Sequence, residues 1–372
     1  MERILHVLGC LDMGGAETMV MNIYRKIDRS KIQFDFIIHS DRQSGYYEEV
    51  IEKGGRVYVF PPFTGKNIFS IKKKWKNFFK EHNYYHILHS HIRSYAAIFI
   101  PIAKSYGLKT IIHSHSTSNG NGISSFAKKI FQFPLRFQAD YFLACSKDAG
   151  NWLFGKKIVN SNKFLLIKNA IDVEKFIFNE QIRNRFREQL KIEDKYVFIH
   201  VGRFQIVKNH RFLLNVFKMI YELDSNVVLI LIGDGPQRDE IMNLANELKI
   251  MDSIVLLGLK NNVNDYLNAA DCFLFPSLWE GLGIVAIEAQ ASGLHTICNE
   301  CLPREIKVTD LCEFISLDKP EEWVKSALNK YNRCHNSFKE IKENGYDINE
   351  TTSVLTSFYK ELIHEKDNFE IR

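Results

Sequence analysis

Short apolar runs alternate with longer amphipathic segments along most of the chain. In the first half, the runs predict strands at residues 4–8, 34–39, 57–60, 87–90, 110–113 and 141–145. The pattern restarts at residues 196–201 and continues through 227–232, 254–257, 272–275 and 296–298. Strands that are nearly continuous in apolar residues and are separated by helical segments are typical of a parallel sheet covered on both faces. The two series predict two doubly wound, Rossmann-like α/β domains.

The length of 372 residues is also typical of two domains. We place the break between Asn169-Ala170-Ile171-Asp172 and a charged helix at residues 182–190. Residues 1–172 then form an N-terminal domain, residues 173–348 a C-terminal domain, and residues 349–372 a final helix that crosses back to the first domain. Open parallel sheets bind ligands beyond the carboxyl ends of their strands. We therefore expect a site in a cleft that both domains face.

The net charge of +5 is unevenly distributed. Residues 1–180 carry 26 Lys and Arg against 15 Asp and Glu, whereas residues 181–372 carry 23 against 29. Residues 51–150 alone hold 15 basic and 4 acidic side chains. Such a local excess predicts an anionic partner. No nucleic-acid-binding motif accompanies it, so we expect no nucleic acid.

The seven cysteines are an odd number without a paired framework, which indicates a reducing, cytoplasmic setting. The N-terminus runs straight into a predicted strand, so we expect no secretory signal, and no apolar run approaches 18 residues. Cys298-x-x-Cys301, with Cys312 and Cys334-His335 beyond it, is a possible start of a zinc site. These spacings fit no standard site, and we predict no metal.

Glu280 and Glu288 lie on either side of a glycine-rich junction that follows a strand-like run. If a helix begins near Leu282, its rise puts the two carboxylates about 12 Å apart, too far to share one proton or metal. The separation suits two parts of one elongated ligand. Gly281 and Gly283 permit close backbone approach at a helix N-terminus, which favours an anion. The segment therefore predicts a site for a sugar–diphosphate–nucleoside.

The same glycines have a second interpretation. Residues 281–286 fit the G-x-G-x-x-G/A fingerprint of dinucleotide-binding proteins, with Glu300 and Glu305 about 20 residues further on. However, residues 276–280 separate the fingerprint from its strand, and it lies late in the series rather than at the first βα turn. We therefore disfavour a nicotinamide enzyme.

Polar and glycine residues follow several other predicted strands. Arg203 and Lys208 flank a loop where two cations can neutralise a diphosphate, the alternative being two solvated surface residues. Gly14-Gly15 precedes a probable helix and either offers backbone N–H groups to a phosphate or acceptor, or forms a tight turn that needs positive φ. Glycines also follow two strands of the second half, at Gly202, Gly233 and Gly235.

Four histidines end two neighbouring strands, namely His89 and His91, then His113 and His115. A histidine there can orient or polarise a substrate hydroxyl. The alternative is a structural histidine that bonds loop backbone. We expect one of the four to be functional.

Two basic-aromatic segments lie within the basic region, at residues 66–80 and 126–137. On a helix, the first forms an apolar stripe surrounded by lysines, from Ile68, Ile71, Trp75, Phe78 and Phe79. The second contains Phe126, Lys128, Lys129, Phe131, Phe133, Arg136 and Phe137. One such stripe is usually a core-packed helix with a solvated basic face. The two together predict peripheral attachment to anionic lipid on the inner face of the cell membrane.

In their order and spacing, the motifs resemble those of retaining nucleotide-sugar glycosyltransferases of the GT-B fold, specifically glycosyltransferase family four (glycosyl transferases group 1). The likeness covers nearly the whole chain and is greatest for the branch that builds exopolysaccharide or capsule repeat units. It rests on Gly14-Gly15-Ala16-Glu17, Ala144-Cys145-Ser146, Lys168-Asn169-Ala170-Ile171-Asp172, Val201-Gly202-Arg203-Phe204, Lys208-Asn209, Gly233-Asp234-Gly235-Pro236, Phe275-Pro276-Ser277-Leu278-Trp279-Glu280-Gly281-Leu282-Gly283 and Glu288-Ala289. Asn299-Glu300-Cys301 departs from the family, which often has Ser/Ala-Asp there.

The resemblance implies a role for each site residue. Glu288 would bind the ribose diol, and Gly14 and Gly15 would sit near the phosphates and acceptor. The donor sugar and β-phosphate would be held by Glu280 and the backbone of Gly281, Leu282, Gly283 and Ile284. The predicted catalytic residues are His113, Glu280, Arg203 and Lys208, and Gly202, Gly233 and Gly235 complete the donor-binding set.

The chain contains no Asp-x-Asp pair of the kind that holds a metal in many transferases. We therefore expect metal-independent transfer without a cofactor, in which Arg203, Lys208 and the helix N-terminus at Gly283 stabilise the leaving diphosphate. The expected reaction moves a sugar from a UDP-sugar to a lipid-linked saccharide or polysaccharide precursor with retention. A GT-B nucleotide-sugar epimerase and an inactive nucleotide- or saccharide-binding protein are the alternatives.

Overall fold

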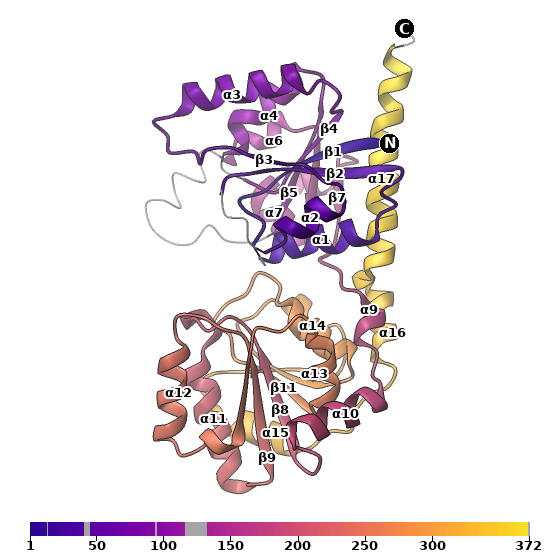
Figure 1. Ribbon diagram of the computed structural model, residues 1–372. Helices are drawn as coiled ribbons and strands as arrows, with labels where there is room; N and C mark the ends of the chain where they lie inside the picture. Colours follow the sequence, from indigo (N-terminus) through magenta and orange to yellow (C-terminus); the bar gives the residue numbers. More distant parts are fainter. Residues whose placement is uncertain (13, 41–44, 94, 116–131, 371–372) are drawn as a thin grey trace. The chain divides into compact units, whose positions relative to one another are not determined.

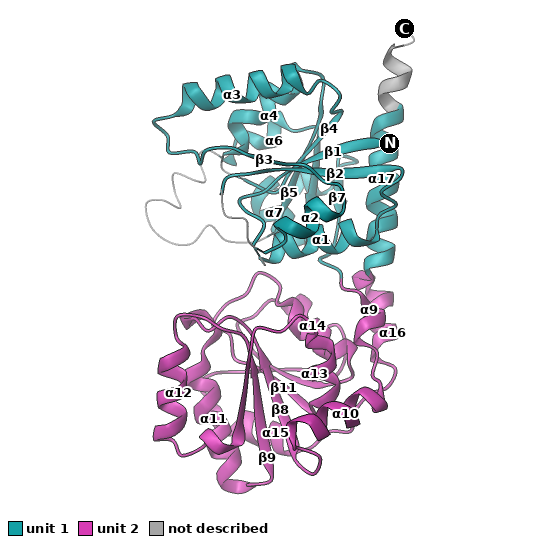
Figure 2. Cartoon of the chain, in the orientation of Figure 1, with its two compact units in different colours: residues 1–170, 348–372 teal, residues 171–347 magenta. Residues whose placement is uncertain are grey.

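The computed structural model describes residues 1–12, 14–40, 45–93, 95–115 and 132–370. The chain divides into two compact units (Figures 1 and 2). Unit 1 comprises residues 1–170 and 348–372, and unit 2 comprises residues 171–347. These divisions lie within two residues of the boundaries expected from the sequence, and the final helix belongs to unit 1.

Within the described residues, unit 1 holds a seven-stranded sheet in the order β3-β2-β1-β4-β5-β6-β7, with every pair parallel. The strands are β1 (Glu2–Val7), β2 (Ile32–Ile38), β3 (Val57–Val59), β4 (Ile87–Ser90), β5 (Lys109–Ser114), β6 (Tyr141–Ala144) and β7 (Phe164–Leu166). The first six coincide with the predicted runs. β7, a run of three residues close to the domain break, was not predicted.

Both faces of this sheet are covered, because successive side chains of a strand point to opposite sides. On β1, Ile4 packs in one apolar cluster with α1 and α17, and Leu5 packs in another with α3 and α4. All seven residues of β2 are buried, including the polar Gln33 and Asp35. The helices are α1 (Gly15–Lys26), α2 (Tyr47–Glu52), α3 (Ile68–Glu81), α4 (Ala96–Ser105), α6 (Leu135–Gln138), α7 (Lys147–Phe154), α8 (Lys156–Val159) and α17 (Ile348–Glu370).

The long helix α17 is part of the core of unit 1. It runs beside α1 (Figure 1) and presents one apolar face to the sheet. That face carries Leu355, Tyr359 and Leu362, which are at most 2% exposed and follow the helical spacing of four and three residues.

Within the described residues, unit 2 holds a six-stranded parallel sheet in the order β10-β9-β8-β11-β12-β13. The strands are β8 (Tyr196–Val201), β9 (Val227–Ile232), β10 (Ile254–Gly258), β11 (Cys272–Phe275), β12 (His295–Asn299) and β13 (Cys312–Ile315). Five were predicted. The edge strand β13 was not, because the exposed Glu313 interrupts its apolar pattern.

Helices cover both faces of this sheet as well, with one apolar cluster on each side. They are α9 (Val173–Phe176), α10 (Glu180–Leu190), α11 (His210–Leu223), α12 (Arg238–Glu247), α13 (Val263–Ala269), α14 (Ile284–Ala291), α15 (Pro320–Leu328) and α16 (Ser337–Ile341). Short helical turns are η1 (Ile206–Lys208), η2 (Met251–Ser253), η3 (Arg304–Ile306) and η4 (Lys342–Tyr346).

The two sheets share one topology. In each unit the chain builds three strands outward in one direction and then returns to continue in the other, so the first and fourth strands are neighbours. This is the strand order of classic Rossmann sheets, whose ligands bind at the reversal point beyond the carboxyl ends of the strands. The reversal lies between β1 and β4 in unit 1 and between β8 and β11 in unit 2.

Candidate active site

In unit 2, hydrogen bonds join the loops that follow β8 and β11, here called the switch-point loops (residues 202–209 and 276–283). The Leu278 N–H donates to the Val207 carbonyl at 2.8 Å. Asn209 Nδ2 donates to the Pro276 carbonyl at 3.3 Å. Because β8 and β11 are adjacent, the two loops form one continuous surface at the reversal point, where a ligand is expected.

Lys208 and Glu280 form an ion pair between these loops, with Nζ 2.6 Å from Oε1. Their side chains are 16% and 15% exposed, so the pair is shielded but open to solvent. Lys208 Nζ also lies 5.3 Å from the centre of the Phe275 ring. The fold therefore brings together the cation predicted for the diphosphate and the carboxylate predicted for the sugar.

Arg203 lies on the same loop as Lys208 but is exposed. It makes no hydrogen bond or ion pair with any residue that the structure describes. Its guanidinium is thus available to an anion, although Arg203 alone also matches the alternative of a solvated surface residue. That alternative does not fit Lys208, which is held by Glu280.

The N-terminus of α14 completes the switch-point loops. Gly283 caps it in the left-handed region, with φ 76°, and a Cβ there would lie 2.9 Å from the Phe275 ring. The Ala286 N–H donates to the Gly283 carbonyl, whereas helix geometry leaves the N–H groups of Ile284 and Val285 without a partner inside the helix. With no acidic side chain in this first turn, the helix end offers donors and partial positive charge to an anion.

Glu288 lies inside α14, a little over one turn beyond its first residue, and is partly buried. Desolvation by burial raises the pKa of its carboxyl from the ordinary 4.5 to about 7. The group is therefore near half-ionised at neutral pH in the free protein. A carboxyl group near its pKa can accept hydrogen bonds from a diol or donate one to it. Glu288 offers such a group at a position separate from Glu280.

The glycines after β8 and β9 allow two loops to touch. A Cβ on Gly233 would lie 2.0 Å from the Gly202 carbonyl oxygen, and one on Gly235 would lie 2.4 Å from that of Phe204. The Phe204 N–H donates to the Asp234 carbonyl at 2.9 Å. These glycines, predicted to bind the donor, therefore have a packing role that holds the Arg203 loop in place.

Two buried histidines near Lys208 were not singled out from the sequence. His200 Nδ1 lies 2.8 Å from the Leu274 carbonyl oxygen, and the rings of His200 and His210 are 4.9 Å apart. Burial lowers the pKa of both, that of His210 to about 4, and the charge of Lys208 lowers them further. Both are neutral supports of the Lys208 loop. The only sequence signal for these two histidines was their position, near the end of β8 and just after η1.

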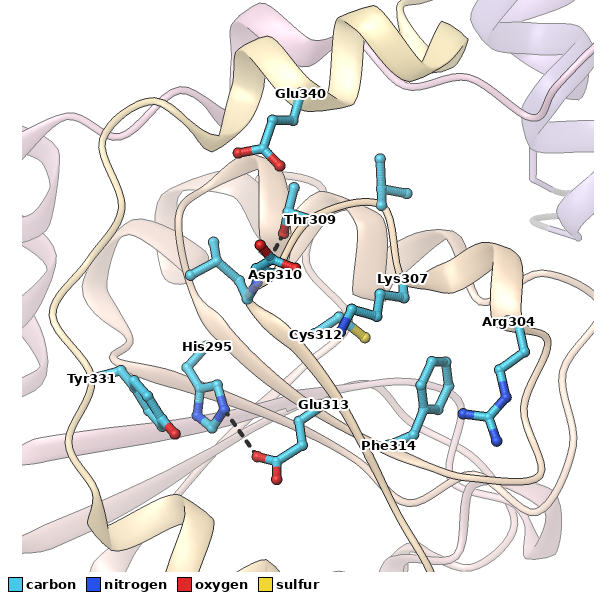
Figure 3. Close-up of a pocket in the computed structure, with 12 residues that line it drawn as sticks. His295, Arg304, Lys307, Thr309, Asp310, Cys312, Glu313, Phe314, Tyr331 and Glu340 are labelled. Atoms are coloured by element: carbon cyan, nitrogen blue, oxygen red, sulfur yellow. Dashed lines mark hydrogen bonds and ion pairs between the residues drawn. The ribbon is translucent and has the colours of Figure 1, made fainter.

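Of two cavities in unit 2, one is lined by residues of the switch-point loops and the other is not. One of about 360 Å³ is lined by residues of the switch-point loops, including Ile206, Asn209 and Leu278, and by residues of α11 and α12. A larger cavity, about 710 Å³, lies along the edge strand β13 between Arg304, Tyr331 and Glu340 (Figure 3). None of the predicted site residues lines the larger cavity, so we place the candidate site at the switch-point loops.

In unit 1, Gly14 and Gly15 lie at the start of α1. Gly14 has φ −91°, and neither glycine has positive φ, so the alternative of a tight turn that requires glycine is wrong. A Cβ added to Gly15 would meet no atom within 4 Å. The fold of unit 1 thus gives no reason for glycine at position 15, which is compatible with close approach of a ligand.

His113 lies in β5 and is 0% exposed, and neither of its ring nitrogens has a hydrogen-bond partner among the described residues. Its ring stacks on that of His115 at 4.1 Å and lies 5.3 Å from that of His89. Burial, first, and the neighbouring histidines hold its pKa well below the usual value, so the imidazole is neutral.

The histidines of unit 1 form a larger cluster than the sequence indicated, because His6 joins it. His6 of β1 is the register partner of His89 on β4. A hydrogen-bonded row runs from His6 Nδ1 to His91 Nε2 at 3.0 Å and from His91 Nδ1 to His115 Nε2 at 2.8 Å. The missed signal was the single polar residue in the first apolar strand.

The cysteines do not support the zinc alternative. Cys298 and Cys312 lie on adjacent strands with their sulfurs 3.8 Å apart, whereas Cys301 is exposed. No cysteine belongs to a cluster of three potential ligands within the part of the chain that the structure describes.

The stripe of α3 faces the core. Ile71, Trp75, Phe78 and Phe79 are buried in the apolar cluster of unit 1, as in the alternative of a core-packed helix. The opposite face is basic and also exposes Phe69. Of the second segment, Phe133 and Phe137 are exposed, while residues 126–131 lie outside the described residues.

No described helix is both long and apolar enough to cross a membrane. Comparison with known families identifies the class of protein. Residues 13–175 match the model of Glycosyltransferase Family 4, and residues 181–346 match that of Glycosyl transferases group 1. The chain belongs to this family of GT-B glycosyltransferases.

Individual relatives extend over the whole chain. EpsF of Bacillus subtilis (strain 168), itself a predicted glycosyltransferase, is 32% identical, with 99% of this chain and 98% of EpsF covered. The Escherichia coli UDP-Gal:alpha-D-GlcNAc-diphosphoundecaprenol alpha-1,3-galactosyltransferase is 23% identical, with 98% of each chain covered. Among solved structures, Anabaena Alr3699/HepE in complex with UDP and glucose has a TM-score of 0.77 at 15% identity, covering 97% of this chain and 100% of that one. This last likeness concerns the fold.

Proposed function

We propose that the protein transfers a sugar from a UDP-sugar to a lipid-linked saccharide in the synthesis of a polysaccharide, with retention and without a metal. The observation that carries the proposal is the Lys208–Glu280 ion pair beside the N-terminus of α14. There a cation, a carboxylate and unpaired backbone N–H groups converge at the reversal point of the sheet.

Transfer of a sugar from a nucleotide diphosphate requires groups that stabilise charges of both signs. Cleavage of the bond between the sugar and the diphosphate leaves negative charge on the diphosphate and positive charge on the sugar. Preorganised donors are most effective where such charge develops. Lys208, the exposed Arg203 and the α14 N-terminus would stabilise the diphosphate, so these groups can take the place of a metal. When the donor is bound, Lys208 would contact its diphosphate as well as Glu280, and the Glu280 carboxylate would accept hydrogen bonds from the sugar hydroxyls.

The nucleotide would extend along α14 to Glu288, whose ionised carboxyl would accept hydrogen bonds from the ribose hydroxyls. The neutral imidazole of His113 would polarise a sugar or acceptor hydroxyl in unit 1. Retention would follow front-face attack without an enzyme nucleophile. We carry over UDP and the lipid-linked acceptor from the relatives described above, whose names include UDP, galactose and diphosphoundecaprenol.

Attachment to an anionic membrane surface would rely on the exposed face of α3. Its stripe is buried, so the contact would come from Lys72, Lys73, Lys76 and Lys80 with the 84% exposed Phe69. Phe133 and Phe137 would add apolar contacts, because α6 and α3 both pack beside α4. Lysines near an anionic surface contribute about 1 kcal/mol each.

The test is incubation of the purified protein with UDP-, GDP- and ADP-sugars, with and without an undecaprenyl-diphosphate-linked saccharide, in the presence and absence of EDTA. We expect a glycosylated lipid from one UDP-sugar, at the same rate in EDTA, with the anomeric configuration of the donor retained by NMR. Turnover of donor to an epimer without acceptor would replace the proposal with an epimerase. Binding without turnover would identify an inactive binding protein.

A further inference from the structure

Three histidines of unit 1 place ring nitrogens close enough to share one ion. His6, His89 and His91 each offer one nitrogen, and these lie within 4.8 Å of one another. The set is built into the sheet, since His6 and His89 are register partners on β1 and β4 and His91 directly follows β4. The rings of His89 and His91 are 4.4 Å apart, and those of His6 and His91 are 5.3 Å apart and nearly parallel.

The side chains are in the form that ligates metals. His6 and His89 are 1% exposed, and burial lowers the pKa of His6 to about 3 and holds those of His89 and His91 well below the usual value. All three imidazoles are therefore neutral at physiological pH.

Two ring nitrogens of these histidines have no partner among the described residues. Nε2 of His6 and Nε2 of His89 are buried and make no hydrogen bond within the part of the chain that the structure describes, which is uncommon for buried polar atoms in proteins. His89 Nδ1 lies 2.6 Å from the Tyr359 hydroxyl oxygen on α17. If Nδ1–H donates to Tyr359, His89 Nε2 carries a lone pair that points to no proton donor. An outer hydrogen bond of this kind commonly orients a metal-ligating histidine.

A second set of three, His91, His113 and His115, is less suited to a cation. Arg93 is close enough for its positive charge to act on His115. Around His6, by contrast, the ring contacts include Phe34 at 4.2 Å and Phe36 at 5.6 Å, which are uncharged. A cation would therefore meet less repulsion at the set that contains His6 and His89 than at the set close to Arg93.

We propose that His6, His89 and His91 form a binding site for one divalent transition-metal ion of the zinc class. Imidazole nitrogens suit zinc, cobalt, nickel and copper, whereas magnesium and calcium prefer oxygen ligands. The ion would join the carboxyl ends of β1 and β4, and its bond to His91 would replace one of the two hydrogen bonds that the ring makes with His6 and His115. It is distinct from a donor-site metal, because it lies in unit 1 and leaves the diphosphate to Lys208 and Arg203.

The test uses tag-free, chelator-stripped full-length protein and the ions Co²⁺ and Zn²⁺ alone. We expect one Co²⁺ per chain with visible d–d bands several-fold stronger than those of the hydrated ion, and displacement of Co²⁺ by Zn²⁺. X-ray absorption of the Zn²⁺ form should give nitrogen ligands at about 2.0–2.1 Å. The melting temperature should rise by several degrees on metal addition and return with EDTA.

Variants identify the site. His6→Gln, His89→Gln and His91→Gln should each lose at least ten-fold in Co²⁺ affinity, whereas the matched controls His82→Gln and His86→Gln, histidines of unit 1 outside the set, should bind as the wild type does. Weak, octahedral-type Co²⁺ spectra in the wild type would overturn the proposal without any variant, which matters if a variant fails to fold. Wild-type affinity in the three folded variants would also overturn it.

Discussion

Lys208 Nζ lies 2.6 Å from Glu280 Oε1, so the lysine that faces the expected diphosphate already has an anionic partner. The two residues come from loops 72 positions apart in the sequence. Each largely shielded charge depends on the other, since removal of one partner leaves the second without compensation. Binding and stability are therefore linked at this pair.

The first prediction concerns this pair. Glu280→Ala and Lys208→Met should each lower kcat/KM by at least about 100-fold, the usual scale for a lost charge-stabilising group. The double variant should lose less than the two single losses combined, because the residues act as a unit. Initial rates and urea midpoints measure both effects. The matched control Lys218→Met, whose partner Glu222 lies 3.1 Å away on the surface of α11, should leave the rate unchanged. Wild-type activity in Glu280→Ala would remove Glu280 from the site.

The second prediction follows from Glu288. Because its pKa rises from 4.5 to about 7 on folding, the native protein keeps a proton that the unfolded chain releases between these values. Its contribution to stability therefore falls as pH rises from about 4.5 to 7, and the loss is complete above pH 7. Glu288→Gln should stabilise the protein by roughly 1–3 kcal/mol at pH 8 and by little at pH 4.5. Urea unfolding across this range, with the exposed Glu247→Gln as control, measures the difference.

The same carboxyl makes nucleotide affinity depend on pH. If the ionised form binds the ribose diol, UDP affinity should increase as pH rises through 7. Glu288→Gln should weaken UDP binding and abolish this dependence. Calorimetry with UDP between pH 6 and pH 8 tests the point, and an unchanged pH profile in the variant would assign the dependence to another group.

The third prediction compares two glycines with positive φ. Gly283 has φ 76° and Gly258 has φ 67°, so alanine strains both backbones by about 1–2 kcal/mol. Only at Gly283 does the new methyl group also meet Phe275 and Ile306. Gly283→Ala should therefore be less stable than Gly258→Ala and should lose donor binding, because the start of α14 must shift. Equal loss of UDP affinity in both variants would argue against an anion site at this helix end.

The fourth prediction separates fold from function at Gly15. This residue is exposed, has no positive φ and has space for a methyl group, so Gly15→Ala should preserve stability or raise it by up to about 1 kcal/mol. Activity should nevertheless fall if a ligand approaches the backbone here. Full activity in a stable Gly15→Ala variant would assign Gly15 no part in the site.

The fifth prediction concerns the exposed face of α3. Lys72→Glu, Lys73→Glu and Lys76→Glu combined should abolish sedimentation with vesicles that contain anionic lipid, and binding of the wild type should weaken with added salt. The control carries the same charge change at exposed lysines of unit 2, Lys249, Lys260 and Lys325. If both variants lost vesicle binding equally, binding would depend on the net charge of the protein rather than on this face of α3.

The positions of most strands along the chain and the two-unit division were predictable because most of the runs are apolar, as β9 shows. Two edge strands were not predicted: β7 is only three residues long and lies next to the domain break, and the exposed Glu313 interrupts β13. Glycine-rich loops and charged residues at strand ends located the switch-point loops.

The sequence could not show which residues from distant segments come into contact. The contact between Lys208 and Glu280, the row of rings that includes His6, and the burial that raises the pKa of Glu288 depend on register and packing between distant segments. The stripe of α3 illustrates the converse: its pattern was clear, but only the fold shows that it faces inward.

The place of α17 in unit 1 has a consequence for biosynthesis. Ile348, Leu355, Tyr359 and Leu362 complete a core whose other buried members lie before residue 171, and the Tyr359 hydroxyl contacts Nδ1 of His89. During translation, unit 1 must wait for all of unit 2 to leave the ribosome before its sheet is covered. Until then its apolar face is exposed, so nascent unit 1 is expected to need protection by chaperones, whereas unit 2 has its whole core in one continuous segment.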